Sequence, residues 1–160
     1  MTVALGADHA GFTLKKDLAA TLVADGHEVL DLGVYAADPP SDYPDVAELV
    51  ALAVRDGKAE RGILVCGSGA GAAIAADKIP GIRCASATDT YTAHQAVEHD
   101  AMNVLAIGSR VVGTELAHEL VRAFIGASFL GAERFLRRLD KVLALESRHC
   151  GTAAPKTPSP

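Results

Sequence analysis

The most informative segment of this chain for its fold is Gly62-Ile63-Leu64-Val65-Cys66-Gly67-Ser68-Gly69-Ala70-Gly71. Its short apolar run, Ile63 to Cys66, is typical of a buried strand, and the glycines after it end that strand in a turn. A helix is expected to begin in this glycine-rich loop and to stop before Pro80-Gly81. Strand, glycine loop and helix in this order indicate one βα unit of a parallel sheet.

The same alternation of apolar runs and helical periods recurs along the chain, which predicts an α/β, Rossmann-like three-layer fold with a five-stranded parallel sheet. The strands are expected at Val3–Gly6, Glu28–Leu32, Ile63–Cys66, Ile82–Ala85 and Val104–Ile107. One domain is expected over residues 1–150, and the proline-rich end, residues 151–160, is expected to be a disordered tail.

Helices are expected between and after these strands. The first has Leu14, Leu18 and Leu22 on one face and ends near Gly26, and the second runs from Pro44, after a polar loop over Gly33–Tyr43, to about Gly57. The others are expected in the glycine-rich loop, at Thr90–His99, at Thr114–Ile125 with Leu116, Leu120, Val121 and Phe124 inward, and at Glu133–Ser147 with Phe135, Leu139 and Val142 inward.

Bulk composition excludes several classes of function. A chain of 160 residues with 49% hydrophobic content has the profile of one compact domain, and its formal net charge of -5 argues against nucleic acid or an anionic membrane as the main partner. No stretch is apolar for long enough to predict a membrane span or a secretion signal. Three irregularly spaced cysteines, at 66, 84 and 150, predict neither a disulfide framework nor a metal pair, and favour the cytoplasm. No metal and no cofactor are expected.

Ligands of parallel α/β sheets bind beyond the carboxyl ends of the strands, so the residues that follow each strand are the candidate site. These are Asp8-His9, the loop from Cys66 to Gly71, and Gly108-Ser109-Arg110. The glycine loop presents backbone N–H groups at a helix start and is expected to bind an anion. The same environment favours a thiolate at Cys66, which makes this residue a candidate base or nucleophile, whereas a small buried apolar residue is the structural alternative.

Other loop chemistries fit less well. A P-loop needs a lysine that is absent before Lys78, and a phosphatase loop needs an arginine where the chain has Ala72. A dinucleotide pattern, Gly67-x-Gly69-x-x-Ala72 with Asp89 further on, survives as a weak match in the third βα unit. A phosphate- or nucleotide-binding module without enzymatic activity therefore remains an alternative.

Five segments together resemble the type B ribose-5-phosphate isomerase family, which also includes allose-6-phosphate and galactose-6-phosphate isomerases. They are Gly6-Ala7-Asp8-His9-Ala10-Gly11-Phe12, Ser41-Asp42-Tyr43-Pro44, Gly62 to Gly71, Lys78-Ile79-Pro80-Gly81-Ile82-Arg83 and Asn103-Val104-Leu105-Ala106-Ile107-Gly108-Ser109-Arg110. The resemblance extends to about Arg148. It implies the interconversion of ribose 5-phosphate and ribulose 5-phosphate through an enediolate, with a tetrulose 4-phosphate or a hexose 6-phosphate as alternative substrates.

The resemblance also implies roles for particular residues. Cys66 would be the proton-transfer base and His99 the ring-opening acid and base, while Gly67, Gly69 and Gly71 with Ser68 would cradle the enediolate oxygens. The phosphate and hydroxyl contacts would come from Asp8, His9, Tyr43, Arg110, Arg134 and Arg138, with Arg137 as a substitute for either of the last two. The family further implies a homodimer, or a dimer of dimers, with the site near the interface and completed by both chains.

Two positions depart from the family pattern. Ala72 stands where some members carry a glutamate base, which leaves Cys66 as the base, and His99-Asp100-Ala101 replaces a common His-Asn-Asp. A carboxylate at Asp100 adds negative charge near an anionic intermediate, so the substrate-binding role of Asp100 bears on the choice of sugar.

Structural roles are the alternatives for several candidates. Asp8-His9 would be a polar strand end, Tyr43 a turn residue, Arg134 and Arg138 a solvated helix face, and His99 a cation at a helix end. The remaining histidines and cysteines are expected on helix or strand surfaces or in the tail, without a functional role: His27, His94, His118, His149, Cys84 and Cys150.

Overall fold

A five-stranded parallel sheet organises the molecule, of which the computed structural model describes residues 1–149. The strands are β1 (Thr2–Ala7), β2 (Glu28–Gly33), β3 (Arg61–Cys66), β4 (Cys84–Ser86) and β5 (Val104–Gly108), in the order β2-β1-β3-β5-β4. The predicted five-stranded parallel sheet is thereby confirmed. Cys150 and the expected tail at residues 151–160 lie outside the described residues.

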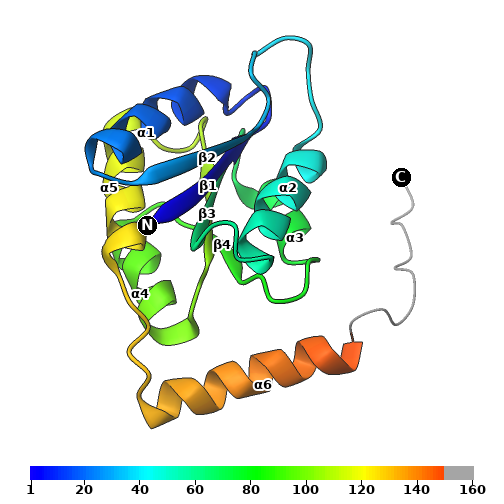
Figure 1. The fold of residues 1–160 in the computed structure, drawn as a ribbon, viewed down its shortest axis with the longest axis vertical. Coiled ribbons are helices and arrows are strands. Elements are labelled where there is room, and N and C mark those ends of the chain that lie inside the picture. The colour runs from blue at the N-terminus through cyan, green and yellow to red at the C-terminus, as the bar shows by residue number, and fades with distance from the viewer. Residues whose placement is uncertain (150–160) are drawn as a thin grey trace.

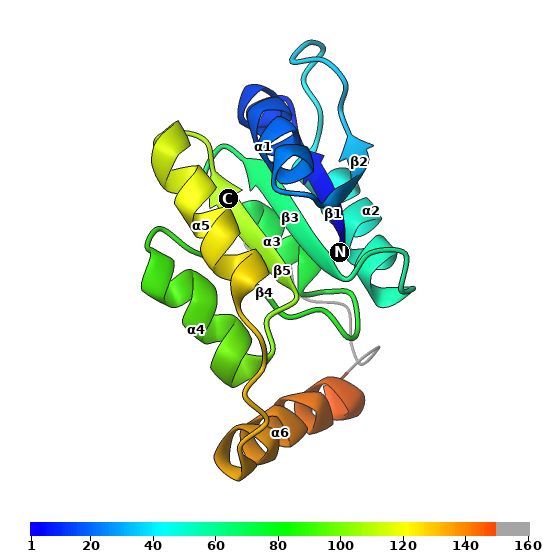
Figure 2. The same ribbon diagram turned by 60° about the vertical axis from the view of Figure 1, so that its left-hand side comes forward.

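Six helices accompany the sheet in the described part of the chain. They are α1 (Phe12–Ala24), α2 (Tyr43–Arg55), α3 (Ala70–Ala76), α4 (Thr90–Asp100), α5 (Thr114–Gly126) and α6 (Glu133–His149). α1, α4 and α5 cover one face of the sheet and α2 and α3 the other, as Figures 1 and 2 show. Within residues 1–149, no helix has both the length and the hydropathy needed to cross a bilayer.

The three central strands are buried on both faces, which explains their nearly continuous apolar sequences. Side chains alternate between the two halves of the core: Ile63 and Val65 pack with α1 and α5, whereas Leu64 and Cys66 pack with α2 and α3. The apolar run that predicted a strand is therefore a run shared by two separate hydrophobic clusters.

The connection between α3 and β4 differs from the prediction. α3 ends at Ala76 rather than just before Pro80, because the chain continues in tight turns in which the Ile79 N–H donates to Ala76 and the Ile82 N–H to Ile79. β4 begins at Cys84, two residues later than expected. The N–H of Arg83 is bound by the side chain of Asn103 and is not available to a strand ladder.

Helix α6 crosses the end of the molecule at the bottom of Figure 1 and contacts the domain through Phe135, which stacks on His99, and Glu146, which accepts from the Gly81 N–H. Among its described residues only Phe135 is buried. Leu139 is half-buried, and Val142 has 49% of its surface exposed, so the prediction that Val142 faces the core is wrong. Periodicity marks the apolar face of a helix but does not say whether the same chain covers that face.

Candidate active site

The chain leaves β1 and β3 toward opposite faces of the sheet. β1 continues into α1, whereas β3 continues into α3, so the two neighbouring strands diverge at their carboxyl ends. Such a point opens a crevice in which ligands of parallel α/β sheets bind. Asp8 and His9 lie on one side of this crevice and the loop after Cys66 on the other.

Cys66 ends β3 with its side chain only 3% exposed. Its Sγ accepts a hydrogen bond from the N–H of Gly69 at 3.1 Å, so the loop folds back over the sulfur. Gly69 has a φ of +81°, a conformation that a residue with a side chain rarely adopts. This bond fixes the sulfur at the end of the strand, beside the backbone of the glycine loop.

Three loops are joined around Cys66 by hydrogen bonds. Ser109 N–H donates to the Cys66 carbonyl at 2.8 Å, and Arg110 N–H donates to the Gly67 carbonyl at 3.0 Å. The Ser109 hydroxyl donates to the carbonyl of Ala10 at 2.9 Å, which ties the loop after β5 to the loop after β1. The exposed side chain of Arg110 passes beside Gly67 and places its positive charge close to the glycine loop.

Asp8 and His9 are fixed in place by local hydrogen bonds. The Asp8 carboxylate, 7% exposed, accepts from the N–H groups of Ala10 and Gly11 at 2.9 and 3.0 Å. His9 Nδ1 lies 3.0 Å from the carbonyl and 3.1 Å from the N–H of Ser41, and the Ser41 hydroxyl accepts from the His9 N–H. Ser41 therefore holds Nδ1 in either protonation state.

Tyr43, the first residue of α2, lies against the glycine loop from the other side. A Cβ built on Gly71 would come within 2.8 Å of the Tyr43 ring, closer than real contacts allow. Ser68 is exposed and accepts a bond from the N–H of Ala70 through its hydroxyl. The structure thus gathers nine candidates at one edge of the sheet: Asp8, His9, Tyr43, Cys66, Gly67, Ser68, Gly69, Gly71 and Arg110.

Sequence reasoning gave no role to three residues that support this edge: Lys15, Ser41 and Ser109. Lys15 is 1% exposed and donates from Nζ to Asp31 at 2.5 Å and to the carbonyl of Val34 at 2.8 Å, which anchors the loop that carries Ser41. Ser109 stood within a candidate segment but received no role of its own, and Ser41 stood within a quoted motif and looked like an ordinary loop residue. A lysine within an apolar helix period was the only visible sign of Lys15.

The other four candidates, His99, Asp100, Arg134 and Arg138, lie at the opposite edge of the sheet. α4 runs back from the end of β4, so its last residues precede the first residue of β5. Val104 pairs with Gly62 at that edge, whereas Gly108 pairs with Cys66 at the other. Four strand residues of about 3.3 Å each put roughly 13 Å between the two edges.

These four residues are close to one another. The His99 ring stacks on Phe135 with the ring centroids 4.1 Å apart and an interplanar angle of 17°, and the guanidinium of Arg134 lies 4.5 Å from the centroid of Phe135. Arg134 and Arg138 are exposed on α6, four residues apart, and Asp100 is exposed beside His99. Within one chain, the sheet separates this cluster from Cys66.

Two of the histidines expected on open surfaces are partly buried instead. His118 is 15% exposed and joins α5 to α1 through Asp17 and Thr21, at 2.6 and 3.0 Å. The Nδ1 atom of His27 is buried without a hydrogen-bond partner. Burial, reinforced by the neighbouring Asp77, raises the pKa of the Cys84 thiol, which keeps this second cysteine protonated and unreactive.

Residues 3–142 match the family described as Ribose/Galactose Isomerase, and the chain belongs to that family. It is 45% identical to ribose-5-phosphate isomerase B of Escherichia coli over 91% of this chain and 97% of that protein. It is 43% identical to D-erythrulose-4-phosphate isomerase of Pectobacterium atrosepticum, over 82% and 86%. The structure of ribose-5-phosphate isomerase B from Clostridium thermocellum superposes with a TM-score of 0.90 at 42% identity, covering 93% and 99%. The resemblance inferred from the motifs is confirmed.

Proposed function

We propose that this chain interconverts an aldose phosphate and a ketose phosphate, with ribose 5-phosphate and ribulose 5-phosphate as the substrate pair. The observation that carries the proposal is the Cys66 sulfur, which accepts the Gly69 N–H where β1 and β3, neighbours in the sheet, continue to opposite faces. Membership of the ribose/galactose isomerase family supports the same reaction. A binding module without catalysis would have no use for a sulfur fixed in this position.

The proposed chemistry moves one proton between two carbons. Cys66 as a thiolate removes the proton from C2 of the open-chain aldose, and the electrons form a C1–C2 enediolate. The protonated thiol then delivers a proton to C1, the proton of the C2 hydroxyl passes to the C1 oxygen, and the carbonyl forms at C2, so Cys66 is a thiolate again at the end. The amides of the glycine loop, with Ser68, would stabilise the enediolate oxygens, a contribution of about 3 to 4 kcal/mol for each such donor.

His99 would open the sugar ring before this step, and it would have to come from a second copy of the chain. His99 and Cys66 lie at opposite edges of one sheet, so a single chain does not bring them together. A homodimer with a two-fold axis would pair each Cys66 with the partner's His99, Arg134 and Arg138. We therefore propose a composite site made by two chains.

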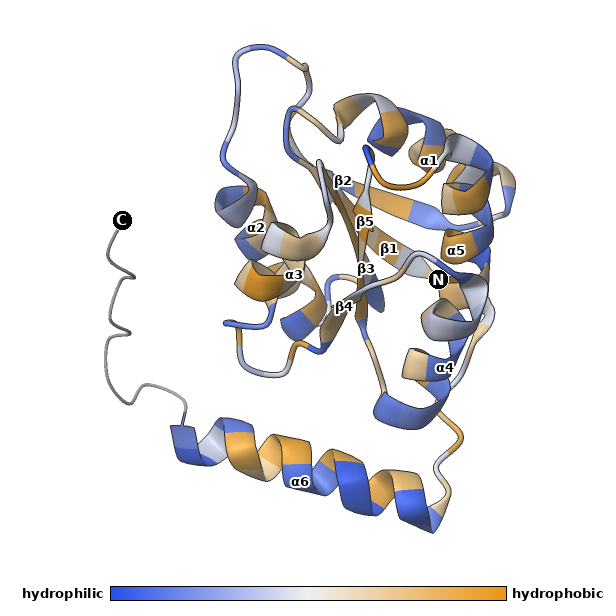
Figure 3. Ribbon diagram, turned by 180° about the vertical axis from the view of Figure 1, so that it is seen from behind, coloured by the Kyte–Doolittle hydropathy of each residue, from blue (hydrophilic) through white to orange (hydrophobic). Residues whose placement is uncertain are grey.

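The uncovered face of α6 supports this assembly. Apolar side chains there have between 39% and 51% of their surface exposed: Leu136, Val142, Leu143 and Leu145. In Figure 3 several segments of the α6 ribbon have the colour of hydrophobic residues. A second copy that covers this face would bury apolar surface and bring the arginines of α6 to the partner's crevice.

Asp100 supports a second candidate substrate, a tetrose 4-phosphate. One of the matched relatives is named as an isomerase of D-erythrulose 4-phosphate, at 43% identity. A shorter sugar would reach less far from Cys66 toward the second cluster, so its phosphate would lie farther from the negative charge of Asp100. The location follows from a different feature. The proposed reaction requires a free thiol at Cys66, and a free thiol supports a cytoplasmic location.

The proposal is tested by measuring kcat/KM on a panel of four-, five- and six-carbon aldose and ketose phosphates. The parent enzyme is expected to prefer the pentose pair. Cys66→Ala is expected to reduce kcat by roughly 100- to 10,000-fold, the contribution of a general base, while it retains affinity for the sugar phosphate. Cys84→Ala is the matched control, because that thiol lies away from the crevice. Normal isomerisation by Cys66→Ala would show that Cys66 is not the base.

A further inference from the structure

Two side chains hold the imidazole of His99. Gln95 lies one helical turn earlier on α4, and its Nε2 is 2.7 Å from Nδ1 of His99. Phe135 of α6 covers one face of the ring at 4.1 Å. Both Gln95 and His99 are half-buried, so the contact is partly shielded from water. The second ring nitrogen of His99, Nε2, takes no part in the contact with Gln95.

An amide is an unusual choice of partner because it serves more than one protonation state. The NH₂ group of Gln95 donates to Nδ1 when that nitrogen carries no proton, and the amide, turned over, accepts from Nδ1–H through its carbonyl oxygen. In the second arrangement the neutral ring keeps a lone pair on Nε2, and the same carbonyl stabilises the imidazolium. A carboxylate could only accept a hydrogen bond, from a protonated Nδ1, and an apolar side chain could make no hydrogen bond to Nδ1 in either state.

We propose that Gln95 is a positioning residue for His99: it occupies Nδ1 and makes Nε2 the atom that exchanges protons with the sugar ring. This inference rests on the ring-opening role given to His99 in the proposed function. Nε2 accepts the proton of the C1 hydroxyl as the bond between C1 and the ring oxygen breaks. It then returns that proton to the former ring oxygen, so the open-chain aldehyde is formed in the site and His99 is neutral again.

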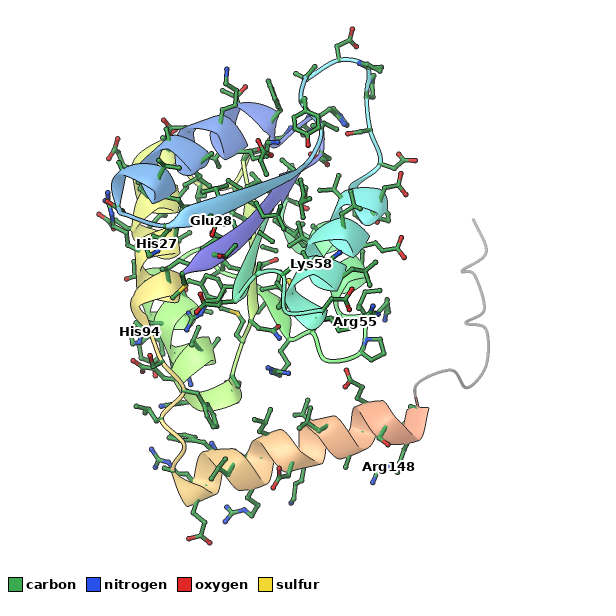
Figure 4. The ribbon with its side chains drawn as sticks, in the orientation of Figure 1. His27, Glu28, Arg55, Lys58, His94 and Arg148 are labelled. Carbon is green, nitrogen blue, oxygen red and sulfur yellow. The ribbon has the colours of Figure 1, made fainter. Side chains whose placement is uncertain are left out.

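The contact is tested without substrate by imidazole ¹⁵N shifts in the ¹⁵N-histidine-labelled full chain. Gln95→Leu is expected to move the Nδ1 shift of His99 toward that of a free imidazole, and Gln95→Glu to place the proton of the neutral ring on Nδ1. Glu98→Leu is the matched control, because Glu98 pairs with His94, labelled in Figure 4, four residues away on the same helix at 3.2 Å. Identical His99 shifts in the parent and Gln95→Leu would overturn the proposal.

Kinetics test the role of the contact. Ribose 5-phosphate is mainly a ring, whereas erythrose 4-phosphate has none to open, because the oxygen that would close a five-membered ring carries the phosphate. Gln95→Leu is expected to lower kcat/KM for ribose 5-phosphate roughly tenfold, the value of one hydrogen bond, and to leave erythrose 4-phosphate unaffected. Glu98→Leu should change neither. An equal loss on both substrates would make Gln95 merely structural and would overturn the proposal.

A failure of the proposed function would be distinguishable from a failure of this inference. If His99→Asn turned over ribose 5-phosphate as fast as the parent, the ring-opening role of His99 would fall, and the kinetic claim for Gln95 would fall with it. The ¹⁵N shifts would still decide whether Gln95 holds Nδ1. A ring-opening defect in His99→Asn without any effect of Gln95→Leu would overturn the inference alone.

Discussion

At the scale of single residues, the contact between Gly71 and Tyr43 links the glycine loop to the side of the crevice. A methyl group at Gly71 would displace the Tyr43 ring, whose nearest atom is 2.8 Å away from the Cβ position. The backbone of Gly71 itself is helical, so an alanine there is compatible with α3. Packing against Tyr43, rather than backbone freedom, is what requires a glycine at this position.

Gly71→Ala is therefore expected to separate stability from activity. The free energy of unfolding should change little. Alanine stabilises a helix by about 0.5 to 1 kcal/mol relative to glycine, and this gain offsets the cost of displacing the Tyr43 ring. The value of kcat/KM should fall roughly five- to tenfold if the Tyr43 hydroxyl loses a hydrogen bond to the sugar phosphate. Urea denaturation and steady-state kinetics measure the two quantities.

Gly126→Ala is the control for this experiment, since an added Cβ there meets nothing within 4 Å. It should leave kcat/KM unchanged. Unchanged kinetics for Gly71→Ala as well would mean that Tyr43 does not touch the substrate.

At the scale of elements, α4 carries both Gln95 and His99, and its start is capped by Asp89. The Asp89 carboxylate accepts from the Thr92 N–H at 2.7 Å and from the Thr92 hydroxyl at 2.8 Å. These bonds hold the pKa of Asp89 below its usual range. The cap is expected to stabilise the helix whose other end positions His99.

Asp89→Ala is expected to lower the free energy of unfolding at pH 7. Because the folded pKa is depressed, the contribution of the charged cap is fully present above the unfolded-state value, about 3.9, and is lost as the pH falls through the folded value. The difference between the variant and the parent should therefore shrink below about pH 4. Urea denaturation from pH 7 to pH 3 measures it.

Asp89→Asn is the matched variant, because an asparagine caps a helix without a titrating group. The difference in unfolding free energy between Asp89→Asn and the parent should vary with pH, because only the parent titrates at this position. The difference between Asp89→Asn and Asp89→Ala should not vary with pH. A deficit of Asp89→Ala that stayed constant down to pH 3 would contradict the assignment of this pH dependence to the cap.

At the scale of the whole molecule, the proposed composite site makes a prediction about mixtures of inactive variants. In a two-fold dimer of one Cys66→Ala chain and one His99→Asn chain, one site has both substitutions and the other has neither. Random mixing makes half of the dimers heterodimers with one intact site each, so about a quarter of the parent activity on ribose 5-phosphate should return.

The two variants are to be mixed after subunit exchange in mild denaturant and assayed against each variant treated alone. As a second test, the double variant Cys66→Ala/His99→Asn is mixed with the parent. Its heterodimers have no intact site, so the mixture should keep a quarter of the parent activity, whereas sites made within single chains would keep half. No recovery in the first mixture, at proven exchange, would show that Cys66 and His99 do not meet across the interface.

Much of the fold was predictable from the sequence because it depends on local patterns. The buried run Ile63–Cys66 and the glycines after it fix a βα unit, and the leucines of α1 fix the face that it buries. The start of β4 was not predictable, because the long-range bond between Asn103 and the N–H of Arg83 delays it. Val142 was misplaced for a similar reason: a period of apolar residues predicts a face but not its partner.

The α/β class, the family and the residue types of the candidate site were all predictable from the sequence, since strand alternation, helix period and loop glycines are local properties. The division of the candidates into two groups depends on how the strands and helices pack. This packing brings Asp8, His9, Tyr43 and Arg110 to Cys66, and it puts His99 and the two arginines of α6 at the other edge. The reason is geometric: parallel strands align their carboxyl ends at one edge, and a helix that returns to begin the next strand must end at the opposite one.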